Sequence, residues 1–138
     1  MKKIPDLVIS PEKVAAILTK ARQFDVKDVV TDPDSGSNAS DDAMLSVLED
    51  HASDPTRTEL SAMIRGLNED EQIDLVALAW LGRGDGDISD WREIRLEADR
   101  AHNRRTAQYL IGIPLLSDYL EEALSQFGHS AEEFERPL

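Results

Sequence analysis

The residues best suited to binding chemistry lie in one short glycine-rich acidic segment. Residues 82–91 read GRGDGDISDW, and the glycines are bracketed by two tryptophans, Trp80 and Trp91. An arginine fork and nearby carboxylates can hold small polar ligands. One hypothesis is therefore a regulator that binds a small ligand or a cation here. Its candidate ligand-binding residues are Trp80, Arg83, Asp85, Asp87 and Trp91.

The same segment partly resembles a calcium-binding loop. Such a loop needs oxygen ligands at positions one, three and five, a glycine at six and a glutamate at twelve. With Gly86 at position six, Asp85 falls correctly at five, but Leu81 and Arg83 fall at one and three, and Arg92 falls at twelve. Because most of this coordination fails, we expect exposed acids in a capped turn, without a metal or another cofactor. The weak metal candidates are Asp85, Asp87 and Asp90.

Arg83 also has a structural interpretation. Its segment lacks the lysine of a phosphate-binding loop and follows a predicted helix rather than a strand. The glycines around it permit backbone angles that other residues avoid. We expect Arg83 to form an ion pair with a carboxylate such as Asp74 or a glutamate of the C-terminal tail, since ion pairs are common outside active sites.

Other reaction chemistries find little support in the sequence. The chain has no cysteine, which excludes disulfides and thiolate metal sites. Its histidines, His51, His102 and His129, are scattered and lack the spacing of a zinc site. No GxSxG nucleophile motif is present. We assign no catalytic residue and do not expect an enzyme.

A second alternative is nucleic-acid binding through an arginine cluster at residues 92–105. The candidate residues are Arg92, Arg95, Arg104 and Arg105. Acidic residues are interleaved with them, and the whole chain carries a net charge of −13. Phosphate backbones repel such a chain, so a mixed-charge helix facing solvent or another subunit is favoured over a nucleic-acid partner.

These candidates surround a predicted central helix over residues 69–82. Asn68 and Glu71 have the spacing of a capping box, and acids fill the first turn. From Ile73 to Leu81 only Asp74 is polar, which is typical of a helix buried on nearly all sides. Gly82 or Gly84 would end this helix in the left-handed conformation.

The remaining periodicity is also helical. Helices are predicted over residues 11–24, 41–52, 55–66, 89–102 and 104–111, with a seventh from Pro114 to Gly128. On the fifth helix, the predicted inward residues are Trp91, Ile94, Ala98 and Ala101. The fold class is therefore all-α, a single compact bundle of about six to seven helices around residues 69–82. Residues 1–40 would be an N-terminal helix and flexible loop that could act as an arm, and residues 41–138 the core domain.

One stretch resembles a known family. It is marked by Leu67, Asn68 and Gln72, then LVALAWLGRGD ending at Asp85, with Trp91 behind it. This pattern is similar to a bacterial family known as domain of unknown function 3775, over about residues 60–135, including Gly128 and Phe134. The resemblance implies a compact helical domain and no particular substrate.

Small size, amphipathic helices and the lack of a catalytic constellation favour a non-enzymatic protein-interaction module. Its partner would be another protein or a second copy of the chain, as a homodimer. The start of the chain lacks the apolar stretch of a signal peptide, and no apolar run is long enough to span a bilayer. We therefore expect a cytoplasmic protein without a membrane partner.

Overall fold

The protein is all-α in the part that its computed structural model describes, residues 4–31 and 55–130, with side chains placed for 4–24 and 55–130. The elements are α1 (Pro11–Thr31), α3 (Pro55–Arg65), α4 (Glu69–Arg83), the short 3-10 helix η2 (Ile88–Asp90), α5 (Trp91–Ala101), α6 (Thr106–Ile111) and α7 (Leu116–Gln126). The helix predicted over residues 41–52, His51 and nearly all of the loop predicted at 31–40 lie outside the described residues, as does the proposed domain boundary at residue 40.

Helix α4 is the central helix, as predicted. The Glu71 amide donates to Asn68 Oδ1 (2.8 Å) and Glu71 Oε1 accepts from the Asn68 amide (3.0 Å), which completes the capping box. The helix ends at Gly84, whose φ of 102° lies in the left-handed region. Glycine adopts this conformation without the steric penalty that a Cβ would bring.

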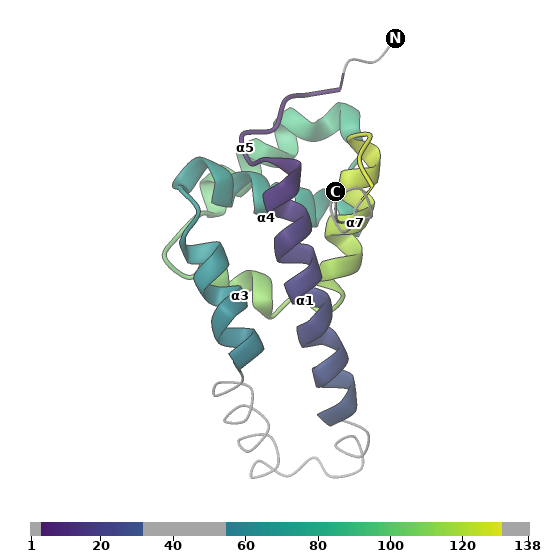
Figure 1. Cartoon of the computed structure of the whole chain (residues 1–138). Coiled ribbons are helices and arrows are strands. Elements are labelled where there is room, and N and C mark those ends of the chain that lie inside the picture. Colours follow the sequence, from purple (N-terminus) through teal and green to yellow (C-terminus); the bar gives the residue numbers. More distant parts are fainter. Residues whose placement is uncertain (1–3, 32–54, 131–138) are drawn as a thin grey trace.

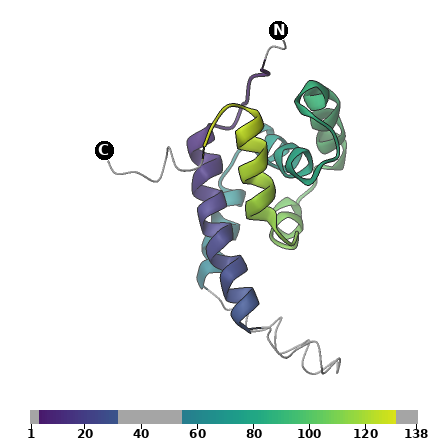
Figure 2. The ribbon, with the colours of Figure 1, turned by 90° about the vertical axis from the view of Figure 1, so that its right-hand side faces the viewer.

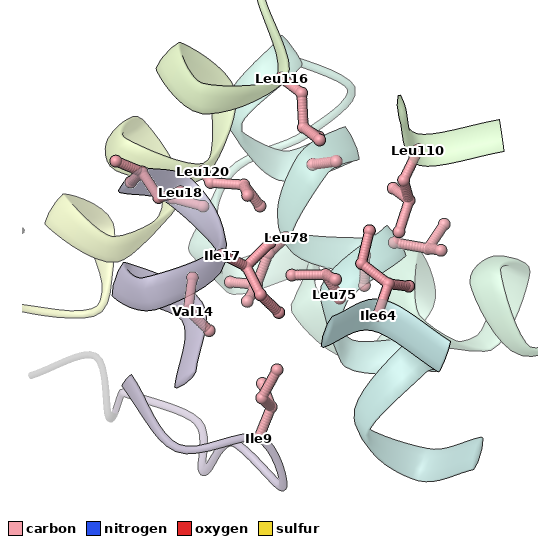
Figure 3. Close-up of a cluster of buried hydrophobic side chains, with 14 of the residues drawn as sticks. Ile9, Val14, Ile17, Leu18, Ile64, Leu75, Leu78, Leu110, Leu116 and Leu120 are labelled. Atoms are coloured by element: carbon pink, nitrogen blue, oxygen red, sulfur yellow. The ribbon is translucent and has the colours of Figure 1, made fainter. Parts of the chain in front are cut away.

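The other helices pack around α4 and bury its apolar run. Helix α7 packs on one side of α4 and α5 on another, while α1 lies alongside α7 and α3 (Figures 1 and 2). Side chains from α1, α3, α4, α6 and α7 meet in one hydrophobic core (Figure 3), to which α5 adds Ile94 and Ala98. Its largest fully buried members include Ile9, Ile17, Leu18, Leu60, Ile64, Leu75, Leu78, Leu110, Leu116 and Leu120.

Gly82 allows α4 and α7 to approach closely. A Cβ placed on Gly82 would lie 1.8 Å from the Tyr119 backbone oxygen of α7. Such a contact is far inside van der Waals distance, so only a residue without a side chain fits here. Of the two glycines predicted to end the helix, Gly84 does so, whereas Gly82 sets the distance between two helices, a role that was not predicted.

Helix α1 forms ion pairs with α4, α3 and α7, each through a different lysine or arginine side chain. The pairs are Lys13 with Glu71 of α4 (2.7 Å), Lys20 with Glu59 of α3 (2.5 Å) and Arg22 with Glu121 of α7 (3.4 Å). The pKa of Glu71 is lowered, first by the hydrogen bond from Lys13 and next by the bond from the Asn68 amide. The pairs of Lys20 and Arg22 lie at the surface, where an ion pair adds little stability, whereas Glu71 is buried and its pair with Lys13 joins α1 to the first turn of α4.

Asp74, the one polar residue in the apolar run of α4, is fully buried. Its Oδ2 accepts from the Val8 and Ile9 amides (2.6 and 3.1 Å), and its Oδ1 accepts from Arg95 Nε (2.6 Å). This carboxylate therefore holds the segment before α1 and the middle of α5 against α4. Asp74, one of the carboxylates predicted to pair with Arg83, pairs with Arg95 instead, and the tail glutamates offered as the alternative lie outside the described residues.

Several predicted helix bounds differ from the structure. Helix α1 continues to Thr31 instead of ending at residue 24, because residues 25–31 contain neither proline nor glycine. The fifth helix begins at Trp91, after η2, and Ala101 at its end is exposed rather than inward. No helix in the described residues is both long and apolar enough to cross a membrane.

Candidate functional site

Trp80 lies between two hollows on the surface of the domain. It lies near the end of α4, is partly buried, and forms a wall of two separate hollows. Its indole Nε1–H donates to the hydroxyl of Tyr109 on α6 (2.8 Å). This bond holds the Trp80 ring between α4, α5 and α6. The ring therefore contributes to both hollows, whose other lining residues differ.

The first hollow is an acidic groove of about 460 Å³ between the end of α4, η2 and α5. Its lining residues are Trp80, Arg83, Asp85, Asp90, Glu93, Ile94 and Glu97. Trp80 and Ile94 supply apolar surface, and around them stand four carboxylates and one guanidinium. We call this hollow the acidic groove. It can accept a ligand that is positively charged and partly apolar.

Arg83 and Asp85 neutralise each other at one end of this groove. Arg83 Nε and its terminal nitrogen donate to the two oxygens of Asp85 (3.1 and 2.6 Å), a bidentate pair. The bond to Asp85 is the main reason that the pKa of Arg83 is raised and that of Asp85 is lowered. The guanidinium carbon also lies 5.9 Å from the centre of the Trp80 ring. Arg83 thus pairs with a carboxylate two residues away, and not with Asp74.

Asp87 and Asp90 cap the turn that leads into α5. Asp87 Oδ1 accepts from the Ser89 amide (2.8 Å) and from the Ser89 hydroxyl, while Asp90 Oδ2 accepts from the Asp87 amide (3.0 Å). With Asp85 held by Arg83, each weak metal candidate already has a protein partner. No group of three or more acids and histidines in the described residues is arranged to hold a metal ion.

Trp91, the fifth predicted ligand-binding residue, points into the core. It is 4% exposed, and its ring meets the ring of Phe127 edge-on at 5.0 Å between centres. It therefore does not line the groove with Trp80, Arg83 and Asp85. The two tryptophans flank the glycines in sequence, but α5 begins at Trp91 and turns its first inward position away from the groove.

The predicted nucleic-acid cluster does not form one free basic face. Arg95 is held by buried Asp74 and also lies 3.7 Å from Asp70. Arg92 is exposed on α5 together with Glu93, Glu97 and Asp99, whereas Arg104 and Arg105 are exposed beyond the end of that helix. Phosphate binding along this helix would therefore have to overcome local as well as total negative charge.

A second set of hollows was not predicted from the sequence. One, of about 220 Å³, is lined by Trp80, Val76, His102, Arg105 and Tyr109 among others. An adjoining one, of about 370 Å³, includes Arg65, Gln72 and Arg104. Arg65 and Tyr109 come from α3 and α6, which the sequence does not show to be neighbours. In the sequence, a signal for this site was the polar pair His102–Asn103 at the junction of two predicted helices.

The fold and these sites can be compared with known proteins. The family described as "Protein of unknown function (DUF3775)" matches residues 57–129. No curated protein and no solved structure matches the chain. The matched residues run from the first turn of α3 to just beyond α7 and include every residue that lines the hollows around Trp80. The chain therefore belongs to this family, which confirms the resemblance seen in its sequence.

Proposed function

We propose that this domain is a non-enzymatic interaction module whose acidic groove docks a basic segment of a partner protein. The observation that supports the proposal most directly is the composition of the groove. It combines apolar surface from Trp80 and Ile94 with four carboxylates and a single guanidinium, which itself is paired. A docked lysine or arginine could place its aliphatic stem on the apolar surface and its charge between the carboxylates.

The carboxylates differ in how far they are already engaged. Glu93 forms no ion pair with any described residue, and Asp90 uses only Oδ2 in the cap of η2. Glu97 pairs with Arg100 (2.9 Å), but both side chains are more than 60% exposed, so a partner can displace that contact at small cost. Glu93 and Glu97 lie one helical turn apart and are the natural contacts for successive basic side chains.

Charge also favours a different protein over a second copy. The chain carries −13, so two copies repel each other, whereas a basic segment is attracted and oriented before contact. A regulator that binds a metal ion here is less favoured. The three carboxylates that could be its ligands, Asp85, Asp87 and Asp90, already accept hydrogen bonds from the protein.

The test is capture of partners from a native lysate by the wild-type chain and by the Glu93→Gln/Glu97→Gln variant, followed by affinity measurement with the basic peptide of the captured protein. Removing two rim charges is expected to weaken binding about tenfold at low salt, with little difference at high salt. Glu122→Gln, an exposed change on α7, is the matched control and should bind as the wild type does.

Two outcomes would contradict the proposal. One is equal affinity of the double variant and the wild type for every captured partner. The other is sedimentation showing that the chain is a salt-insensitive homodimer whose formation blocks the groove. Thermal unfolding of each variant accompanies the measurement and shows whether the helices remain folded.

A further inference from the structure

The two hollows on the other side of Trp80 lie end to end along α4. Gln72, Val76 and Trp80 occupy one face of that helix at four-residue spacing, and each lines one of the hollows. At 1.5 Å per residue, Gln72 and Trp80 are about 12 Å apart along the axis. The hollows measure about 220 and 370 Å³ and share His102, Asn103 and Thr106. Together they are in the size range of small-molecule sites. We call them the Trp80–Arg104 cleft.

One end of this cleft is aromatic and apolar. Trp80 and Tyr109 are joined by the hydrogen bond from the indole, and Val76 and Ala98 form surface beside them. Tyr109 is 44% exposed, so part of its ring is open to a ligand. Fixed aromatic rings beside small aliphatic side chains suit the flat face of a ring system.

The other end of the cleft is basic. Arg65 and Arg104 line it, while Arg105 lines the hollow that holds Trp80 and Tyr109; no aspartate or glutamate is among the residues that line either hollow. None of the three arginines forms an ion pair with a described residue. In a chain with a net charge of −13, three unpaired guanidiniums along one cleft are unexpected. Guanidinium groups match the oxygens of a phosphate in geometry and charge.

The polar groups between the two ends are held in place by the fold. Gln72 Nε2 donates to the Ile64 carbonyl (3.0 Å), which turns its Oε1 toward His102 Nε2 at 2.8 Å. His102 Nδ1 lies 3.6 Å from Glu69 Oε1 at the start of α4. Asn103 Oδ1 accepts from the Arg105 amide (2.7 Å), so the amino group of Asn103 can still donate to a ligand.

We infer that the Trp80–Arg104 cleft binds a small molecule that joins a planar ring to a phosphate, such as a nucleoside monophosphate. The ring would lie against Trp80 and Tyr109, and the phosphate would accept hydrogen bonds from Arg65 and Arg104. This inference does not depend on the proposed function, since the cleft and the acidic groove share only Trp80. Binding here would nevertheless alter the wall of the groove.

The experiment titrates the full chain with the adenosine, guanosine, cytidine and uridine monophosphates, followed by calorimetry and by tryptophan fluorescence, to which Trp80 contributes together with buried Trp91. Inorganic phosphate and adenosine are titrated as the separate halves. We expect at least one monophosphate to bind more tightly than either half and to change the emission. In the Arg65→Gln/Arg104→Gln variant that monophosphate should bind at least tenfold more weakly, since two charge-assisted hydrogen bonds are lost.

Arg92→Gln is the matched control, because Arg92 is exposed on α5 and lines neither hollow. It should bind as the wild type does. Arg104→Gln alone provides a second variant if the double change alters the fold. The inference is overturned if none of the monophosphates binds, if inorganic phosphate binds as tightly as the best of them, or if affinity is unchanged in both arginine variants.

Discussion

Substitution of Gly82 by alanine sets two physical effects against each other. Alanine is favoured over glycine inside a helix by about 0.8–1.0 kcal/mol. Against this, the new Cβ would lie 1.8 Å from the Tyr119 backbone oxygen. Because that atom belongs to the backbone of α7, no side-chain rotation relieves the overlap. Helices α4 and α7 would have to separate by about 1.5 Å to restore an ordinary contact.

Separation of these helices would loosen the largest helix contact of the core. Leu116 and Leu120 of α7 are buried against the apolar run of α4, and a gap of even 0.5–1 Å forfeits roughly a quarter to a half of each dispersion contact. Overpacking usually costs about 1–3 kcal/mol, and a backbone obstacle belongs at or beyond the upper end of that range. After the helix-propensity gain, we expect Gly82→Ala to lower the free energy of unfolding by about 2 kcal/mol.

Urea and thermal unfolding followed by circular dichroism would measure this change. A loss of about 2 kcal/mol corresponds to a Tm lower by roughly 5–10 °C for a domain of this size. Gly112→Ala is the matched control. Its Cβ would meet no atom closer than 3.4 Å, and its φ is −78°, so its stability should stay within about 0.5 kcal/mol. A Gly82→Ala protein that melts at or above the wild-type temperature would refute the argument.

Three further changes test other contacts. Asp74→Ala should destabilise the fold by about 3–5 kcal/mol in urea unfolding, since it leaves Arg95 and two amides without their acceptor; a loss below about 1 kcal/mol would contradict this. For Glu71, whose folded pKa is lowered, the stabilisation is present above its ordinary pKa of 4.5 and is lost as pH falls through the folded value. Glu71→Gln should therefore be less stable than the wild type at neutral pH, with a difference that shrinks in acid; a pH-independent difference would count against it. Leu115→Asn should raise Tm slightly, because exposed Leu115 has a φ of 64°, which asparagine tolerates better; a lower Tm would show that the Leu115 side chain contributes more than its exposure indicates.

The parts of the fold predicted correctly from the sequence depend on local signals. The capping box of Asn68 and Glu71 acts over three residues, and the apolar run of α4 indicates burial by itself. Its partners could not be predicted in the same way. Val8 and Ile9 contact Asp74 from 65 or more positions away, and Arg95 does so from 21. With many carboxylates and arginines in the chain, spacing alone does not select a pair.

The candidate site was predicted only where its residues are close to one another in sequence. Trp80, Arg83 and Asp85 do come together, because one turn of chain joins them. Trp91 was assigned to that site by its nearness in sequence, but the direction in which α5 leaves η2 turns it into the core. The Trp80–Arg104 cleft escaped prediction because its walls come from α3, α4, α5 and α6, whose arrangement is a property of the whole fold.

Helix α1 has a practical consequence for anyone who trims this chain. The family match begins at residue 57, well after α1, yet Val14, Ile17 and Leu18 of α1 are almost completely shielded from water against the other helices. A polypeptide cut at the family limits would uncover the faces of α7 and α3 on which α1 packs. The residues that match the family are thus fewer than the residues that fold together. A domain truncated to the match would expose apolar surface and would be prone to aggregate or to bind another apolar helix in place of α1.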